Sequence, residues 1–364
     1  MKSVHQESIV SDLAITHYTQ QCVTQLRDAL SLGERARVNI ALLSREPTSL
    51  CFRATLETAS PENSSPFFIK IPIEINEISI RNFQKEIEFY HHISEMCTTA
   101  EQTTRHVLPR FIDGCASATK CLLILEDLSQ THQPINRYTL PTNSQIERMI
   151  HCLATIHSEW WGSHHHVTSL PSEVQQTYIL TDFMRGADTY FHDFVLNSQF
   201  HLSGKHIQHF KRLFERLPER LQQRLFSEQH GNHHHLTLIH SDPHPGNFLL
   251  HQETASLKLI DWQDWKISFS AHDLVHLVIS SIDISKYVFH DIDLLNIYMN
   301  ALSQHIKHHF SFEQLLYDYR LGILRSLCVP IRHWKINLPA HLWMPQLTHS
   351  LAACDRLNCW ELLA

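Results

Sequence analysis

The sequence is poor in glycine and has no long apolar run. Only 8 of its 364 residues are glycine, and nowhere do 18 apolar residues follow one another. A chain without such a run offers no transmembrane helix. The first residues, MKSVHQESIVSDLAITHY, also lack the apolar stretch of a signal peptide. We therefore expect a cytoplasmic protein with no membrane insertion.

Paired cysteine motifs and clusters of basic residues are missing as well. The 9 cysteines are scattered without a CxxC pair, and an odd number cannot all pair within one chain. This usage is typical of reduced thiols in the cytoplasm. A formal net charge of −7, with no run of Lys and Arg, argues against a nucleic-acid-binding surface. The same charge would suit a cationic or neutral small molecule, although net charge says little about a single pocket.

Histidine is the residue present in excess, with 31 copies and short runs at 164–166 and 233–235. One interpretation is a metal reservoir, and the other is a set of polar loop residues. Zinc sites need fixed ligands at fixed spacings, whereas these runs lie among Ser, Gly, Asn and Gln without partnering cysteines. The pattern favours the loop interpretation.

The first third of the chain predicts a small sheet with helices beside it. Residues 8–32 carry apolar side chains at helical spacing, and Gly33 reads as the stop. The runs VNIALLS, LCFRATLE and FFIKIPI alternate as strands do, with loops of Pro, Ser and Asn between them. A helix follows in ISIRNFQKEIEFYHHISEM, and further strands are expected near Phe111 and in CLLILEDL.

After Leu128 the apolar period becomes mostly helical. Amphipathic stretches cover residues 144–160, 205–227, 287–309 and 312–328, and two β-like runs interrupt them, LTLIH at 236–240 and LKLID at 257–261. A sheet-rich part followed by a larger helical part predicts an α+β protein with two lobes. We expect an N-lobe with a small antiparallel sheet at residues 1–128 and a helical C-lobe at 129–364.

The strongest chemical signal is a pair of strands that each end in polar residues. The first leads into HSDPHPGN and delivers His240, Asp242 and Asn247, and the second ends at Asp261. The Pro-His-Pro-Gly turn brings Asn247 back near Asp242. Phosphoryl transfer needs a carboxylate to orient and deprotonate the acceptor, and oxygen ligands to hold Mg²⁺ on the nucleotide. Because Mg²⁺ favours carboxylate and amide oxygens, Asn247 and Asp261 suit it better than histidine does.

These motifs resemble a known superfamily. His240-x-Asp242-x-His244-x-x-Asn247, followed by Ile260-Asp261-Trp262-Gln263, is similar to the aminoglycoside phosphotransferase and choline kinase-like superfamily, especially its ecdysteroid kinase-like branch. The resemblance covers roughly residues 35 to 330 and is strongest at 236–276. It implies a protein-kinase-like fold, Asp242 as the catalytic base, and Asn247 and Asp261 as metal ligands. It also implies that His240 is a packed, orienting residue and that Asp273 braces the catalytic loop.

Two other interpretations of this motif remain. An HxDxH pattern also occurs in metallohydrolases, but no second His/Asp cluster completes a metal cage here, and IDWQ has no role in one. HSDPHPGN is also similar to the catalytic loop of the atypical ABC1/UbiB kinases. Their N-terminal KxGQ signature is absent, and IDW stands in place of their DFG.

A kinase of this kind needs a lysine on its sheet and a glutamate on the neighbouring helix to hold the nucleotide phosphates. Lys70 lies inside the apolar strand FFIKI, where an unpaired ammonium would be costly to bury. In the next helix Glu86 shares one face with Phe83 and Tyr90, whereas Glu88 points elsewhere. We predict an ion pair between Lys70 and Glu86.

The remaining nucleotide contacts follow from the resemblance. CLLILEDL resembles the hinge strand, where adenine recognition uses backbone groups, so Glu126, Asp127 and Leu128 are expected to contribute their main chains. The phosphate-covering hairpin has the turn Glu46-Pro-Thr-Ser49 and no glycine. Glycine lets backbone amides approach phosphates closely. We therefore expect Ser49 to donate through its side chain or its amide.

Together these features predict an ATP- and Mg²⁺-dependent kinase that phosphorylates a hydroxyl of a small molecule, either a metabolite or an antibiotic. The alternative is a nucleotide-binding pseudokinase that serves as a binding module, which the glycine-free turn favours. A protein kinase is disfavoured, because Trp262-Gln263 replaces Phe-Gly and no Ala-Pro-Glu follows. The acceptor pocket is expected within residues 160–200 and 283–335. The identity of the acceptor, the preference for ATP or GTP and the oligomeric state are open at this point.

Overall fold

The computed structural model describes residues 12–32, 37–46, 48–57, 66–96, 104–136, 139–162, 177–230, 235–282, 286, 290–306 and 309–364. Gly33, Pro47 and the histidines at 164–166 lie outside these ranges. The chain divides into two compact units. Unit 1 draws on Met1–Glu101, Leu108–His132 and Asp261–Gln263, and unit 2 on Gln102–Val107, Gln133–Ile260 and Asp264–Ala364. The lobe boundary expected after Leu128 stays a prediction.

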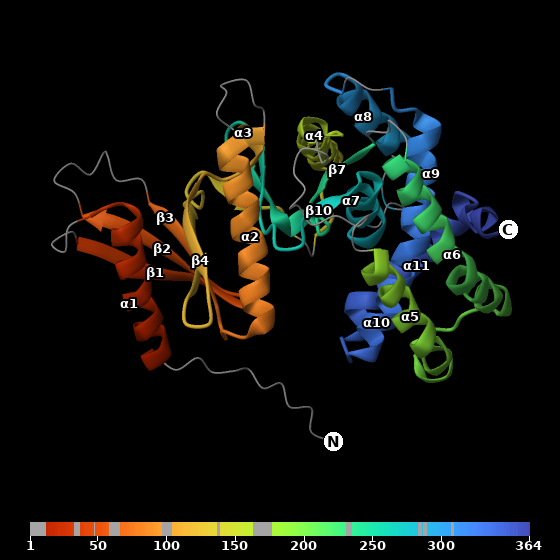
Figure 1. The fold of residues 1–364 in the computed structure, drawn as a ribbon, viewed down its shortest axis with the longest axis horizontal. Helices are drawn as coiled ribbons and strands as arrows, with labels where there is room; N and C mark the ends of the chain where they lie inside the picture. The colour runs from red at the N-terminus through yellow and green to blue at the C-terminus, as the bar shows by residue number, and fades with distance from the viewer. Residues whose placement is uncertain are drawn as a thin grey trace. The chain divides into compact units, whose positions relative to one another are not determined.

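Unit 1 is built on a five-stranded antiparallel sheet with the strand order β1-β2-β3-β5-β4 (Figure 1). Its strands are β1 (Arg37–Arg45), β2 (Ser49–Glu57), β3 (Phe67–Pro72), β4 (Phe111–Ala116) and β5 (Cys121–Glu126). Helix α1 (Asp12–Ala29) precedes the sheet, and α2 (Glu77–Met96) connects β3 to β4. The strands and α2 match the elements that the apolar periodicity predicts.

One face of this sheet forms the core of unit 1 with α1. Side chains alternate between the two faces of a strand, so every second residue of β2 and β3 points to this side. The core residues include Leu50, Phe52 and Ile69 from the strands, together with Cys22 and Leu26 from α1. Burying these apolar side chains fixes which residues of β3 face away from α1.

The opposite face of the sheet carries Lys70 and meets α2. Lys70 of β3 is paired in register with Cys51 of β2, so both lie on this second face. Helix α2 packs closely here, because a Cβ added at Gly114 of β4 would lie 2.8 Å from the side chain of Ile87. Glycine at position 114 therefore allows the helix that carries Glu86 to approach the sheet.

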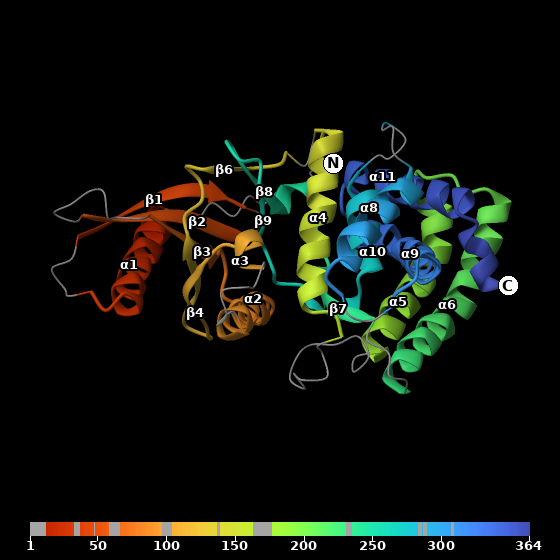
Figure 2. The same ribbon diagram turned by 90° about the horizontal axis from the view of Figure 1, so that it is seen from above.

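Unit 2 is mainly helical. Its longer helices are α4 (Asn143–Glu159), α5 (Thr177–Asn197), α6 (Gly204–His230), α8 (Asp291–Ser303), α9 (Phe312–Ser326), α10 (Cys328–Lys335) and α11 (Ala340–Arg356). Short elements add α3 (Thr104–Val107), β6 (His132–Pro134, whose first residue belongs to unit 1) and a final 3₁₀ turn at Cys359–Leu363. Figure 2 shows α4 beside α8 and α5 beside α6, and the two helices of each pair are packed against each other. The described helices of the whole chain include none that is long and apolar enough to cross a bilayer.

Short strands flank the HSDPHPGN motif in unit 2. β7 (Leu236–Ile239) pairs antiparallel with β10 (Lys266–Phe269), and β8 (Phe248–His251) pairs antiparallel with β9 (Leu257–Leu259). β10 leads into the short helix α7 (Ala271–Val275), which continues as a π-helical turn at His276–Ser280. The α+β class, with an antiparallel sheet in the N-terminal part and a helical C-terminal part, is confirmed. Helix α8 is shorter than the expected 287–309.

Candidate active site

Lys70 lies at the centre of a charged group in unit 1. Its Nζ is 2.9 Å from Oε2 of Glu86 and 2.6 Å from Oδ1 of Asp261. Burial of the side chain opposes the ammonium form, but the two carboxylates outweigh it and raise the pKa of Lys70. The lysine is therefore cationic at neutral pH, as a group that binds phosphate oxygens must be. The predicted partner Glu86 is in place, and Asp261 joins the same group.

Helix α2 holds the segment that carries Asp261 through two of its residues. Oε1 of Glu86 accepts a hydrogen bond from the amide of Trp262 at 3.3 Å. One turn along, the Phe89 ring stacks on the Trp262 ring with centroids 3.9 Å apart and an interplanar angle of 6°. Asp261 itself has a φ of 69°, a left-handed conformation that Asp tolerates better than most residues do. The tryptophan of the IDWQ motif thus anchors Asp261 in its unusual backbone conformation.

The expected hinge segment is tied to the sheet by both backbone and side chain. The amide of Glu126 donates to the Arg110 carbonyl at 2.9 Å, and the amide of Asp127 donates to the Pro66 carbonyl at 3.1 Å. The Asp127 carboxylate lies 2.6 Å from Nε of Arg53. Burial opposes ionisation of Asp127, but hydrogen bonds from Ser129 and Arg53 outweigh it and lower the pKa of this carboxyl. The side-chain bond to Arg53 was not predicted from the sequence.

Ser49 begins β2 on the same face as Lys70 and is buried. The hydroxyls of Ser44 and Ser49 act against burial and favour the ionised form of the Cys51 thiol. Burial nonetheless raises the pKa of Cys51, so this thiol is protonated beside the lysine. The role of Ser49 in binding phosphate stays a prediction.

The residues of the HSDPHPGN motif, 240–247, form a loop in unit 2 that we call the motif loop. Asp273 on α7 fixes the backbone at the start of this loop. Its two carboxylate oxygens accept hydrogen bonds from the amides of His240, at 2.7 Å, and Ser241, at 2.8 Å. Ser241 has a φ of 75°, so this brace acts where the chain takes a left-handed turn. His240 is fully buried, and its Nε2 donates to the Ile260 carbonyl at 2.9 Å. This geometry agrees with a packed, orienting His240 and a bracing Asp273.

Asp273 is buried together with the partners that keep it ionised. Nε2 of His157 lies 3.2 Å from its carboxylate, and Nδ1 of His157 lies 2.8 Å from the Tyr298 hydroxyl. Burial would favour the protonated acid, but the hydrogen bonds from His157 and from the amide of His240 outweigh it and lower the pKa of Asp273. The negative charge therefore contributes to stability at neutral pH.

We expect Asp273→Asn to lower the free energy of unfolding by about 3 kcal/mol at pH 7, because the new amide would face a buried N–H donor. Asp193→Asn, at an exposed position on α5, is the control. Since folding lowers the pKa of Asp273, its stabilisation is complete above the unfolded pKa of about 3.9 and is lost as the pH falls through the folded pKa. Urea unfolding should give the same difference in the free energy of unfolding between wild type and Asp273→Asn at pH 7 and at pH 5. A difference below about 0.5 kcal/mol, usual for surface changes, would contradict the brace.

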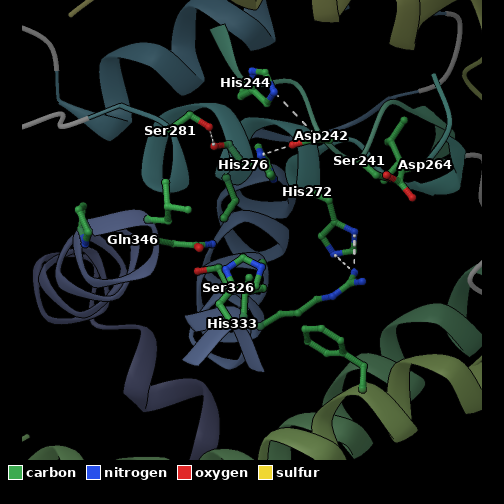
Figure 3. A pocket seen from close by; sticks show the side chains of 18 of the residues that line it. Ser241, Asp242, His244, Asp264, His272, His276, Ser281, Ser326, His333 and Gln346 are labelled. Carbon is green, nitrogen blue, oxygen red and sulfur yellow. Dashed lines mark hydrogen bonds and ion pairs between the residues drawn. The ribbon is translucent and has the colours of Figure 1, made fainter. Parts of the chain in front are cut away.

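Asp242 and Asn247 lie together in the turn that follows Ser241. Nδ2 of Asn247 donates to the Asp242 carbonyl at 2.9 Å, and a 3₁₀ turn at Pro245–Asn247 returns the chain toward it. The Asp242 carboxylate is 2.8 Å from Nε2 of His276 and 3.9 Å from Nε2 of His244 (Figure 3). Burial opposes its ionisation, but the hydrogen bond with His276 and the neighbouring histidines lower the pKa of Asp242 to about 2. It is a carboxylate at neutral pH.

Asp242 lies at the wall of a cavity of about 640 Å³. Helices α5, α7, α9, α10 and α11 contribute to this cavity, together with the motif loop and β10. Its apolar wall includes Phe183, Val275, Val329, Leu342 and Pro345. Its polar wall includes His272, His276, His333 and Gln346, which Figure 3 shows around the same space as Asp242. The volume is in the range of pockets that bind small molecules.

The predicted metal ligands have the right donor chemistry for Mg²⁺. The amide nitrogen of Asn247 is used by the Asp242 carbonyl, which leaves its oxygen as a donor to a cation. The Asp261 side chain is a carboxylate that remains partly exposed beside Lys70. Mg²⁺ takes most of its ligands from nucleotide phosphates and water, so one or two protein oxygens suffice. Within the ranges that the structure describes, no group of three or more His, Cys, Asp and Glu is arranged to hold a metal ion.

The structure brings the predicted residues together in two sets. Lys70, Glu86 and Asp261 form one in unit 1, and Asp242 with Asn247 forms the other in unit 2. Glu126, Asp127 and Leu128 follow one another at the end of β5. His276 and the cavity were not predicted individually, although α5, α9 and α10 fall largely within the two regions expected to form the acceptor pocket.

A sequence model of the ecdysteroid kinase-like family matches residues 46–309. The chain belongs to the ecdysteroid kinase-like family. This membership confirms the expected superfamily and the expectation of a kinase that phosphorylates small molecules. No curated protein matched the chain.

Solved structures similar to this ecdysteroid kinase-like chain share its fold at low identity. Choline kinase from Cryptosporidium parvum Iowa II is 12% identical, with a TM-score of 0.57, 94% of this chain covered and 97% of that one. Ethanolamine kinase from Plasmodium vivax is 11% identical, with a TM-score of 0.56 and coverages of 97% and 93%. An amicoumacin kinase in complex with AMP-PNP and Ca²⁺ is 12% identical, with a TM-score of 0.51 and coverages of 99% and 96%. At these identities the likeness shows the protein-kinase-like fold.

Proposed function

We propose that this protein transfers the γ-phosphoryl group of ATP, in the presence of Mg²⁺, to a hydroxyl of a small molecule bound in the unit 2 cavity. The observation that carries the proposal is the ionised Asp242 at the wall of a ligand-sized cavity. Lys70, held cationic by Glu86 and Asp261, supplies the group that would bind the nucleotide phosphates. The cytoplasmic location also stays a prediction.

The hydrogen bonds of the expected hinge segment reduce the number of backbone amides that could bind adenine. Because the amides of Glu126 and Asp127 already donate to the carbonyls of Arg110 and Pro66, adenine recognition by these two N–H groups would break sheet hydrogen bonds. The amide of Leu128 is then the donor that adenine would use. Asn247 and Asp261 would hold Mg²⁺, which neutralises charge on the phosphates when bound.

The chain's own contribution to the transfer step is orientation of the acceptor. The acceptor oxygen forms a bond to the γ-phosphorus, the bond from phosphorus to the bridging oxygen of ADP breaks, and the hydroxyl proton passes to Asp242. A carboxylate with a pKa of about 2 is a weak base. This is compatible with a loose transition state, in which little proton transfer is needed before the phosphoryl group moves. Positioning and electrostatics therefore account for the rate.

The cavity favours an uncharged or anionic acceptor over a cationic one. Its lining carries Lys266, Arg325 and several histidines, against the carboxylates of Asp242 and Asp264. Proteins bind quaternary ammonium groups in cages of aromatic rings. Among the described lining residues Phe183 is the one with a phenyl, phenol or indole ring, and the guanidinium of Arg332 lies 4.6 Å from its centroid. An alkylammonium acceptor would find no such cage in this lining.

The test is ADP release from ATP and Mg²⁺ with a panel of acceptors. The panel contains sugars, hydroxy acids, sterols and indole alcohols beside choline, ethanolamine and aminoglycosides, with Asp242→Ala as the control enzyme. We expect release above background with an uncharged or anionic alcohol, and loss of that release in the variant. Preferential turnover of choline or an aminoglycoside would contradict the acceptor class. Release that persists in Asp242→Ala would contradict the role of Asp242.

The pseudokinase alternative predicts ATP binding without transfer to any acceptor or to water. The retention of Asp242 together with Lys70, Glu86 and Asp261 supports the enzyme instead, because a binding module has no need to retain the base. A calorimetric titration with ATP and Mg²⁺, run beside the panel, separates the two functions.

A further inference from the structure

The two carboxylate oxygens of Asp242 have different surroundings. Oδ1 lies 2.8 Å from Nε2 of His276, a normal hydrogen-bonding distance for an imidazole N–H and a carboxylate. Oδ2 lies 3.9 Å from Nε2 of His244, beyond that distance. Both histidines line the cavity and approach Asp242 from different segments (Figure 3). One oxygen is therefore occupied by His276, and the other faces a space in which a hydroxyl could bind.

His276 occupies this position because of the turn that it begins. Asp273 and His276 are three residues apart along α7 and its continuation, so they lie on one face of the helix. Asp273 holds the backbone of the motif loop, and His276 reaches the carboxylate at its centre. The residues from His276 to Ser280 form a π-helical turn, which the Ser281 hydroxyl supports by donating to the His276 carbonyl at 2.9 Å. Such turns are rare and often occur at functional sites.

Stability does not explain this contact. The side chains of His276 and Asp242 are 31% and 37% exposed, and ion pairs with this much exposure contribute little to folding. The backbone of the loop is already held by the buried carboxylate of Asp273 through two hydrogen bonds. What the His276 contact adds is a fixed rotation of the Asp242 carboxylate in the cavity wall.

We propose that His276 is a positioning residue for Asp242. Its Nε2–H donates to Oδ1 and turns Oδ2 toward the acceptor hydroxyl, whose proton Oδ2 takes as the acceptor oxygen bonds to the γ-phosphorus and ADP leaves. The inference rests on the proposed function. Misplacing a catalytic group by about 1 Å can cost about 100-fold in rate, so the contact matters to turnover even though its contribution to stability is small.

The test compares two replacements of His276 with the panel acceptor that gives the highest turnover. His276→Phe keeps a ring of similar size and removes the donor, and we expect kcat to fall by about 30-fold while KM for acceptor and ATP changes by less than about threefold. His276→Gln retains a side-chain N–H and should recover kcat to within about fivefold of wild type. If His276 only filled space, His276→Phe would retain a higher kcat than His276→Gln.

His272→Phe is the matched control on the same wall of the cavity. His272 also belongs to α7, but it contacts Ser268 and Arg325 and has no hydrogen bond to Asp242. We expect this change to act on the acceptor KM more than on kcat. Equal losses of kcat in His272→Phe and His276→Phe would overturn the assignment to His276.

A spectroscopic measurement checks the contact without any acceptor. The signals of His276 in long-range ¹H–¹⁵N spectra are assigned as those that disappear in His276→Phe. In the wild-type protein at pH 8, we expect Nε2 of His276 to carry a proton. A bare Nε2 with the proton on Nδ1 would overturn the inference, because that tautomer cannot donate to Oδ1. Full kcat in His276→Phe would overturn this inference alone. Absence of any transfer by wild type would overturn the proposed function and the inference with it.

Discussion

Asp242→Asn should lower kcat by about 10³-fold while the Kd for ATP changes by less than about threefold. The amide keeps the shape of the side chain and its contact with the cavity, but it cannot accept the acceptor proton as a carboxylate does. The loss corresponds to about 4 kcal/mol of transition-state stabilisation, within the range for removal of a general base. Initial rates at saturating acceptor and calorimetric titration with ATP measure the two quantities separately.

Asp193→Asn is the control for this change, because it makes the same replacement at an exposed position on α5. Its kcat should equal that of wild type within error. If Asp242→Asn retained more than about a tenth of the wild-type kcat, the contribution would be smaller than a general base normally makes. Another group would then have to orient the acceptor.

Lys70→Met should reduce kcat/KM for ATP by about 100-fold or more, because the ammonium that would bind the phosphates is lost. The change also leaves Glu86 and Asp261 without the cation that both contact at 2.6–2.9 Å. Burial already raises the pKa of Glu86, so without the lysine this carboxyl will take up a proton. We therefore expect a lower thermal midpoint as well as a lower rate.

A double variant separates these two effects of Lys70→Met. Glu86→Gln added to it removes the buried carboxyl group, and should recover part of the lost stability without recovering activity. Lys120→Met, on the turn before β5 in the same unit, should leave kcat/KM unchanged. Activity of Lys70→Met within a few-fold of wild type would contradict the assignment of the phosphate-binding lysine.

The parts of the fold that could be predicted are those with a clear apolar periodicity or with a motif of several closely spaced functional residues. The pairing of Lys70 with Glu86 followed from two local patterns, a lysine within an apolar strand and a glutamate on the apolar face of the next helix. The nearness of Asp242 to Asn247 came from the motif, in which a strand end and a proline-rich turn fix side chains over a few residues. The bracing role of Asp273 came from the resemblance to the kinase superfamily. Asp261 was expected in the part of the chain after Leu128, but it belongs to unit 1, where it meets Lys70 and Glu86.

The features that the sequence could not provide depend on tertiary packing. His276 reaches Asp242 through a π-helical turn more than thirty residues along the chain, and neither apolar period nor motif spacing indicates such a turn. The cavity is lined from four long helices and one short one, and α11, with Pro345 inside it, lies outside the regions expected to line the pocket. The bond from Arg53 to Asp127 joins β2 to the segment that follows β5 across the sheet. At the sequence level Arg53 looks like any polar residue of a strand.

The most direct measurement of the central claim is transfer of labelled phosphate from [γ-³²P]ATP, with Mg²⁺, to an uncharged or anionic alcohol, followed by identification of the labelled product. The account predicts a phosphate ester on a hydroxyl with the wild-type protein, formed about 10³-fold more slowly with Asp242→Asn, although both bind ATP. Label recovered only as inorganic phosphate or only in ATP, with every acceptor tested and with ATP bound, would contradict it.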